Sequence, residues 1–273
     1  MGIGVPRGIH VLEPARRAMK RSTAEAPNFG SGPDPLAGGR IHRLGGDILL
    51  DERVSWCPPG VRRRQPVSCY LVRGRSGSVL VDTGIRLHAD QILRQLDRLL
   101  APGEPLSIVL TRTEMECCLN LPAIEARFSV ESVWYTGGIT VPRAAAAARR
   151  VSVEPGSSLE VEVIDGVVLE FVSPLLRLLP TLWIFDPESG VLLTSDAFTH
   201  GTDAGADPRD GLRKFRWFTQ ADTRPIAHDV LRNVRNRQVA AIGPGYGVPF
   251  TGVAECAREA EGLAVAIFEM GGR

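Results

Sequence analysis

The order of the predicted strands and helices is the feature of this sequence that most restricts its fold. Each half of the chain begins with strands joined in hairpins and continues with strand-helix units. The first half opens with the hairpin Ser68–Arg73 and Ser78–Asp82, and the second opens with hairpins spanning 159–172 and 182–194. Because each sheet must bury an apolar face, two similar halves indicate two sheets packed face to face with helices outside.

Turn residues and the spacing of apolar residues define the other elements. Asp165-Gly166, between two β-branched runs, is a typical hairpin turn. Apolar residues from Ile92 to Leu100 recur at helical spacing and stop at Ala101-Pro102-Gly103, which predicts a helix. The remaining predictions are strands at Leu106–Leu110, Ser132–Tyr135 and Gln238–Ile242, helices near Leu121–Phe128, Pro225–Arg237 and Val253–Met270, and a surface loop at 201–214.

The first 40 residues differ from the rest in composition. They are basic, and a Gly/Pro/Ser-rich run from Asn28 to Arg40 ends them, so we expect residues 1–40 to be a disordered leader and 41–273 to be the folded domain. An organellar transit peptide is the alternative, although Glu13, Glu25 and Asp34 disfavour it. A translation start at Met19 is also open.

Composition excludes several classes of protein. The formal net charge of +1 gives no attraction for nucleic acid, and no apolar run reaches the roughly 18 residues that a membrane span needs. The five cysteines are an odd number without CxxC spacing, and no secretory apolar segment precedes them. We therefore expect a cytoplasmic protein with reduced thiols and without a nucleic-acid or membrane partner. The sequence leaves its oligomeric state open.

Four polar segments follow predicted strands, and such segments usually carry the chemistry of an α/β scaffold. They are Thr111–Cys118, Pro174–Arg177, Ser195–Phe198 and Gly243–Tyr246. We expect them to converge at one site.

Three runs of residues carry a resemblance to a known family. Cys69–Val72, Val79–Gly84 and Leu110–Cys117 resemble the metallo-β-lactamase superfamily, which implies an α/β fold of four layers, the αββα sandwich. Glu114 inside the loop resembles the H-x-E-x-D-H pattern of flavodiiron proteins rather than the H-x-H-x-D-H pattern of zinc hydrolases. Val191–Phe198 is similar to the flavodiiron stretch around the metal-bridging aspartate, and the resemblance covers roughly residues 66–250.

The resemblance also assigns candidate site residues, but none of them is histidine. The four family histidines fall on Arg112, Cys117, Arg177 and Tyr246, and the family carboxylates fall on Glu114, Glu116 and Asp196. The resemblance implies one iron at Arg112, Glu114, Arg177 and Asp196, and the other at Glu116, Cys117, Asp196 and Tyr246.

The chemistry of these side chains argues against the first metal. A guanidinium has no lone pair and stays charged, so Arg112 and Arg177 would repel a cation. Both can instead pair with Glu114 and Asp196, and we expect a network of ion pairs in place of the metal. The second set of oxygen and sulfur donors could hold one iron or zinc ion. The favoured alternative is that Cys117 is a small buried residue and Tyr246 fills a cavity, so no cofactor is expected.

Three functions follow as hypotheses. The first is a metal-poor protein whose pocket binds or converts a small polar or anionic molecule, with the seven residues above as candidate catalytic residues and Cys117 or Tyr246 moving a proton or acting as a nucleophile. The second is a single-metal oxidoreductase or hydrolase, supplied with electrons by a redox partner because no flavodoxin-like module is expected in the chain. The third is a non-catalytic structural or interaction subunit that pairs with an intact relative.

Overall fold

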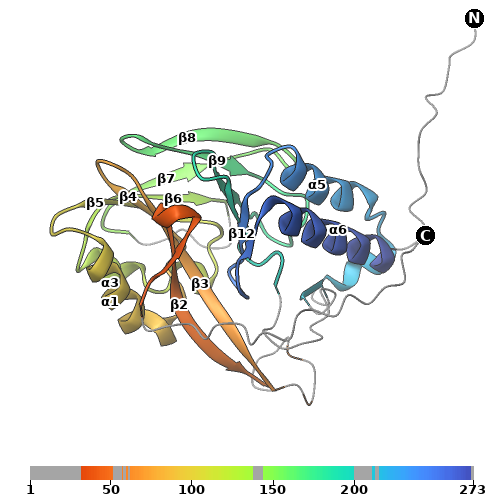
Figure 1. Cartoon of the computed structure of the whole chain (residues 1–273), viewed down its shortest axis with the longest axis horizontal. Coiled ribbons are helices and arrows are strands. Elements are labelled where there is room, and N and C mark those ends of the chain that lie inside the picture. Colours follow the sequence, from red (N-terminus) through yellow and green to blue (C-terminus); the bar gives the residue numbers. More distant parts are fainter. Residues whose placement is uncertain are drawn as a thin grey trace, which may run out of the picture.

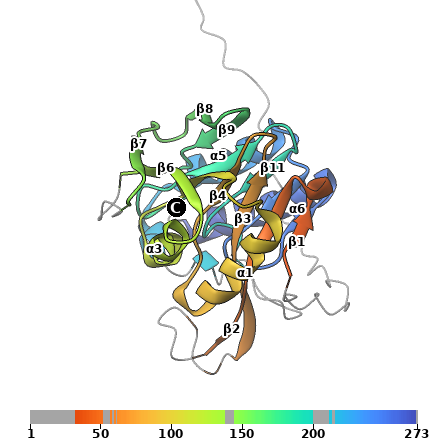
Figure 2. The same ribbon diagram turned by 90° about the vertical axis from the view of Figure 1, so that its left-hand side faces the viewer.

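The computed structural model describes residues 32–51, 57, 60, 62–137, 144–199, 211–212 and 215–271. Two sheets lie face to face, with helices on both outer sides (Figure 1). The perpendicular view in Figure 2 shows α1 and α3 on the side of the first sheet and α5 and α6 behind the second. The predicted αββα sandwich is confirmed.

The first sheet contains seven strands in the order β1 to β7. Its first four strands are antiparallel neighbours, and β4, β5, β6 and β7 run parallel. The strands are β1 (Asp34–Leu36), β2 (Ile41–Leu50), β3 (Arg63–Arg73), β4 (Ser78–Val81), β5 (Pro105–Leu110), β6 (Ser129–Thr136) and β7 (Ala147–Val151).

The second sheet contains six strands in the order β13-β12-β11-β10-β9-β8, and only β11 and β12 are parallel neighbours. The strands are β8 (Ser158–Ile164), β9 (Val167–Val172), β10 (Trp183–Asp186), β11 (Val191–Leu193), β12 (Ala241–Gly243) and β13 (Phe250–Thr251). The helices are η1 (Ala37–Gly39), η2 (Arg86–His88), α1 (Ala89–Leu99), α2 (Met115–Cys118), α3 (Leu121–Glu125), η3 (Arg216–Gln220), α5 (Arg224–Arg235) and α6 (Val253–Met270). None of the described helices is both long and apolar enough to cross a lipid bilayer.

Three apolar clusters hold the four layers together. Alternate residues of β4 face opposite ways, as a strand requires: Val79 and Val81 pack between the sheets, whereas Leu80 packs under the first pair of helices with Ile92 and Ile124. The third cluster joins the second sheet to α5 and α6 and contains the fully buried Trp183, Phe218 and Ile267 among its members. Burial on both faces explains why central strands such as β4 and β11 are almost entirely apolar.

The sequence located the hairpins and the helices α1, α5 and α6, but it missed strands that lack an apolar pattern. β7 is Ala-Ala-Arg-Arg-Val and lies exposed at the edge of its sheet. β2 contains Gly45, where a Cβ would lie 2.1 Å from the carbonyl oxygen of Val67, so only glycine lets β3 pass.

The predicted boundary of the folded domain is wrong by several residues. The expected disordered leader was 1–40, but β1 pairs with β2 and η1 follows it. Proline and glycine in Asp34–Gly39 support a short edge strand and a turn as well as disorder. Residues 1–31, and most of the loop predicted at 201–214, lie outside the described residues.

An ion pair joins the two sheets near this boundary. Arg40 donates from Nε to Oδ2 of Asp186 at 2.8 Å and from Nη2 to Oδ1 at 3.1 Å, and from Nη1 to the carbonyl of Arg73 at 3.0 Å. The side chain of Asp186 is only 2% exposed. The pair therefore fixes the start of β2 and the end of β3 against the end of β10.

Replacing Asp186 should destabilise the protein much more than breaking a surface pair. We expect Asp186→Ala to lower the free energy of unfolding by about 2–4 kcal/mol, since it removes the buried carboxylate that pairs with Arg40 and leaves the guanidinium with the exposed carboxylate of Glu188, 2.9 Å from Nη1. Glu261→Ala, which removes an exposed partner of Arg235, should cost less than about 1 kcal/mol. Urea denaturation of both variants makes the comparison, and equal losses would contradict it.

Candidate functional site

Segments that follow strands of both sheets meet at one end of the sandwich. Two of the four predicted segments are joined by their main chains, because the amide of Gly245 donates to the carbonyl of Ser195 at 2.6 Å. The hydroxyl groups of Thr111 and Ser195, whose oxygens are 2.8 Å apart, join a third segment to them. The carbonyl of Gly245 also accepts from the amide of Ser68 on β3 at 2.8 Å. Main-chain and side-chain hydrogen bonds together therefore connect the loops after β5, β11 and β12.

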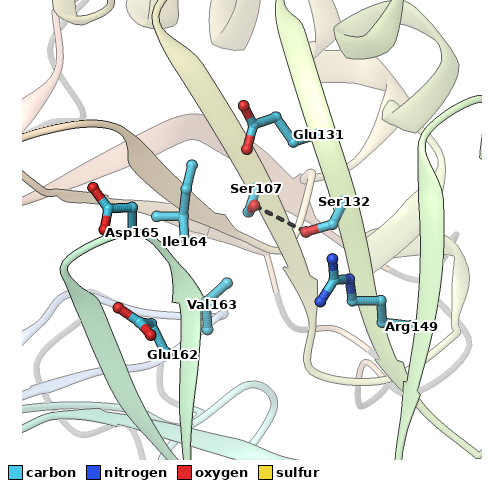
Figure 3. Close-up of a pocket in the computed structure, with 8 residues that line it drawn as sticks. All are labelled: Ser107, Glu131, Ser132, Arg149, Glu162, Val163, Ile164 and Asp165. Carbon is cyan, nitrogen blue, oxygen red and sulfur yellow. Dashed lines mark hydrogen bonds between the residues drawn. The ribbon is translucent and has the colours of Figure 1, made fainter.

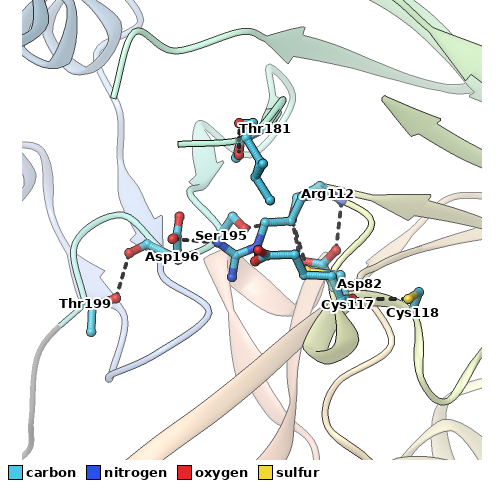
Figure 4. A network of polar contacts seen from close by, with 11 residues as sticks. Asp82, Arg112, Cys117, Cys118, Thr181, Ser195, Asp196 and Thr199 are labelled. Atoms are coloured by element: carbon cyan, nitrogen blue, oxygen red, sulfur yellow. Dashed lines mark hydrogen bonds and ion pairs between the residues drawn. The ribbon is translucent and has the colours of Figure 1, made fainter. Parts of the chain in front are cut away.

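Arg112 lies at the centre of this site. Its Nη1 is 2.5 Å from Oδ2 of Asp196, and its Nε is 3.2 Å from Oε2 of Glu114 (Figure 4). The side chain of Arg112 is 7% exposed, against 17% for Asp196 and 39% for Glu114. A buried guanidinium thus bridges a carboxylate from the loop of the first sheet and one from the loop of the second, as the sequence predicted for these three residues.

A chain of hydrogen bonds lies behind the arginine. Asp82 accepts at 2.8 Å from both the amide and the hydroxyl of Thr111, and the Thr111 and Ser195 hydroxyl oxygens are also 2.8 Å apart. A hydroxyl has one proton, so when Asp82 is ionised Thr111 donates to it and accepts from Ser195. Asp82 and Ser195 have φ values of 61° and 54°, a left-handed backbone that is uncommon outside glycine.

Burial dominates the titration of Asp82. It raises the pKa of this carboxyl from its ordinary value of 3.8 to about 6, although the hydrogen bonds from Thr111 and the positive charge of Arg112 act in the opposite direction. Asp82 is therefore much more easily protonated than an exposed aspartate. The sequence analysis used Asp82 only as the end of a hairpin, because burial is not visible in its motif.

Cys117 packs into the same network from the other side. It is 1% exposed, its Sγ is 3.7 Å from Oγ1 of Thr111, and its carbonyl accepts from the amide and hydroxyl of Thr83 at 2.8 Å each. Asn120 donates to the carbonyls of Thr83, Gly84 and Ile85, which fixes the turn that carries Asp82. This environment is that of a small buried thiol held by its backbone.

Arg177 does not take the place expected for it. Its Nη1 donates to Oγ of Ser173 at 2.9 Å, and it forms no ion pair with Glu114 or Asp196 in the described part of the chain. The expected pair of arginines is therefore corrected to a single one. The half-buried side chain of Arg177 points back toward the end of β9, because Ser173, four residues earlier and directly after that strand, offers a hydroxyl acceptor.

Tyr246 and Glu116 are the last two of the predicted site residues. Tyr246 forms an isolated backbone bridge with Val67 at the rim of the site. The tyrosine that is buried here is Tyr70, whose hydroxyl donates to the carbonyl of Pro244 at 2.8 Å. The backbone of Glu116 lies in α2, while its side chain lies outside the described part of the structure.

The residues at the Arg112 position do not fit a metal ion. Arg112 has no lone pair to donate, and its guanidinium already pairs with both carboxylates that would ligate a cation there. Among the described residues, no three His, Cys, Asp or Glu side chains form a group that could hold a metal. The side chains at this position therefore do not support catalysis by a bound iron ion.

Comparisons with known proteins agree with the fold. The family model of the metallo-beta-lactamase superfamily matches residues 62–111, and no sequence of a curated protein matches the chain. Rubredoxin oxygen:oxidoreductase from Desulfovibrio gigas is 16% identical with a TM-score of 0.58, over 83% of this chain and 60% of that one. A fragment of putative diflavin flavoprotein A 5 from Nostoc is 16% identical with a TM-score of 0.60, over 87% of this chain and 96% of the fragment.

A third structure, a peroxy diiron species of the chemotaxis sensor ODP, is 12% identical with a TM-score of 0.57, over 84% of this chain and 91% of the sensor. The chain thus spans only 60% of the Desulfovibrio protein, but 91% of the sensor and 96% of the Nostoc fragment. The resemblance to the metallo-β-lactamase superfamily is confirmed, and the chain has the fold of flavodiiron cores.

Proposed function

We propose that this chain is a metal-poor protein of the metallo-β-lactamase fold, in which Arg112 occupies the place of a metal ion and the pocket binds or converts a small polar molecule. One observation carries the proposal, namely the contact of the Arg112 guanidinium with both Glu114 and Asp196. A cation covalently attached to the chain here neutralises the carboxylates, which would otherwise need a bound metal.

The charges of the site favour a polar ligand over an anionic one. Arg112 contributes one positive charge and already contacts two carboxylates, so it has little attraction left for an anion. Glu114, whose side chain is 39% exposed, is the group of this trio best placed to accept a hydrogen bond or proton from a ligand. Arg112 then acts as a positioning residue that holds Glu114.

The flavodiiron neighbours support a second candidate function. Their names refer to oxygen:oxidoreductase activity and to diiron centres, so an oxidoreductase or hydrolase with one iron or zinc at Glu116, Cys117, Asp196 and Tyr246 stays a proposal for this chain. Such an oxidoreductase would need a redox partner or an intact homologue to supply its electrons. The engagement of Asp196 by Arg112 and the burial of Cys117 against Thr111 favour the metal-poor alternative. The buried cysteines Cys69, Cys117 and Cys256 form no disulfide among the described residues, which supports a reducing compartment such as the cytoplasm.

Metal content and ligand binding test the proposed function together. Plasma mass spectrometry of the purified protein, before and after exposure to excess iron and zinc, should give well below one metal per chain. A thermal-shift screen of small polar molecules should then give hits that Glu114→Gln loses and the exposed control Glu154→Gln keeps. One metal per chain that disappears in Asp196→Asn would overturn the proposal in favour of the second candidate.

The ion pair of Arg112 and Asp196 should show strong energetic coupling. Arg112→Met alone should cost about 2–3 kcal/mol of unfolding free energy, because the mostly buried Asp196 loses the guanidinium that lies 2.5 Å from it. Adding Asp196→Asn should recover part of this loss, with a coupling energy of about 1–2 kcal/mol in a double-mutant cycle. Strictly additive losses would show that the pair does not hold the site.

The raised pKa of Asp82 should appear in the pH dependence of stability. The folded protein binds this proton up to about pH 6 and the unfolded chain only up to about 3.8, so the contribution is largest below that lower value and is lost as pH rises to about 6. The stability of the wild type relative to Asp82→Asn should therefore be about 2 kcal/mol greater at pH 4.5 than at pH 7.5. Urea denaturation at the two pH values measures the difference, in which other groups cancel, and a pH-independent difference would refute it.

A further inference from the structure

A second polar pocket, of about 310 Å³, lies between the two sheets away from the Arg112 site. Strands β5, β6 and β7 form one wall, and the end of β8 with the following turn forms the other (Figure 3). Ser107 on β5 lines it, whereas Thr111 of the first site follows four residues later, about 13 Å along an extended strand. The two sites are therefore separate, and the proposed function does not use this pocket.

Two buried hydroxyls form the floor of this pocket. Ser107 and Ser132 are 1% and 4% exposed, and their oxygens are 2.9 Å apart. Oγ of Ser132 also accepts from Nε1 of Trp134 at 2.9 Å. Two hydroxyls have two protons and their mutual hydrogen bond uses one, so the second proton has no acceptor among the described residues and is available to a ligand.

Arg149 adds a positive charge beside these hydroxyls. Its guanidinium lies over the ring of Trp134, 5.0 Å from the centroid, which fixes its position. Figure 3 shows the guanidinium directed from β7 toward Ser132 and the space between the walls. No described carboxylate forms an ion pair with Arg149, so the fork of donors and the spare hydroxyl proton are together suited to a carboxylate ligand.

The opposite side of the pocket is acidic. Glu162 and Asp165 line the wall formed by the second sheet, and Glu131 lies on β6. The two former side chains are held in place, since Glu162 accepts from the amide of Gly166 at 3.2 Å and Asp165 accepts from the hydroxyl of Ser76 at 2.9 Å. Three carboxylates against one arginine give the pocket a net charge of −2 at neutral pH, which favours a ligand with net positive charge.

We propose that this pocket binds a small amino acid with a basic side chain. The carboxylate of the ligand would lie on Arg149 and the Ser107–Ser132 hydroxyl pair, and its ammonium groups on Glu131, Glu162 and Asp165. The volume is in the range of small-molecule sites, and the position of Arg149 on one wall, across from Glu162 and Asp165 on the other, fits a molecule that carries both charges.

Calorimetric titration with L-lysine, cadaverine and hexanoate tests the proposal, since cadaverine carries both ammonium groups of lysine without its carboxylate and hexanoate carries a carboxylate alone. Lysine should bind at millimolar concentration or below, and cadaverine and hexanoate should each bind at least about tenfold more weakly. Arg149→Gln should weaken lysine binding by about tenfold or more, because the carboxylate contact is lost, and should not weaken the binding of cadaverine, which has no carboxylate. Glu162→Gln should weaken both cations.

Matched controls come from neighbouring positions. Arg150→Gln and Glu160→Gln change exposed residues of the same strands that do not line the pocket, and they should bind lysine like the wild type. The proposal is overturned if lysine gives no saturable heat, if cadaverine binds as tightly as lysine, or if the control variants lose binding as much as Arg149→Gln and Glu162→Gln do. Far-ultraviolet circular dichroism verifies that each variant is folded.

Discussion

A guanidinium that is almost completely buried needs its counter-charges within reach, and Arg112 finds them in Glu114 and Asp196. The first carboxylate comes from the same loop, but the second comes from the other sheet. The ion pair with Asp196 therefore forms only when the two sheets are packed and their loops have met. Under the proposed function, the Arg112 side chain takes the place of a metal ion at this junction between the loops.

The rest of the scaffold keeps this junction in place. Asp82 and Ser195 end their strands in left-handed backbone conformations, and Thr111 joins them through its amide and hydroxyl. The strands themselves are fixed by three apolar clusters, one between the sheets and one under each pair of helices. The local cost of the unusual backbone and of the buried carboxyl is thus offset by packing elsewhere.

The parts of the fold that depend on local chemistry could be predicted from the sequence. Helix α6 has the expected bounds, and Asp165-Gly166 forms the expected turn. β2 and β7 were missed, because one depends on a glycine that admits a neighbouring strand and the other is an exposed edge without an apolar pattern. In the site, the contacts of Arg112 followed from the family resemblance, which placed it beside Glu114 and Asp196, and from the opposite charges of these side chains. The direction of Arg177 did not, because Ser173 was an equally available partner, and the burial of Asp82 depends on tertiary structure.

Anomalous X-ray diffraction from crystals grown with excess iron and zinc would show directly which group lies between Glu114 and Asp196. Data collected at the absorption edge of each metal distinguish a bound ion from a side chain. With Arg112 in the place of a metal ion, we expect continuous electron density for its guanidinium between the two carboxylates and no anomalous peak at that position. An anomalous peak within bonding distance of Asp196, with Arg112 displaced from the carboxylates, would contradict it.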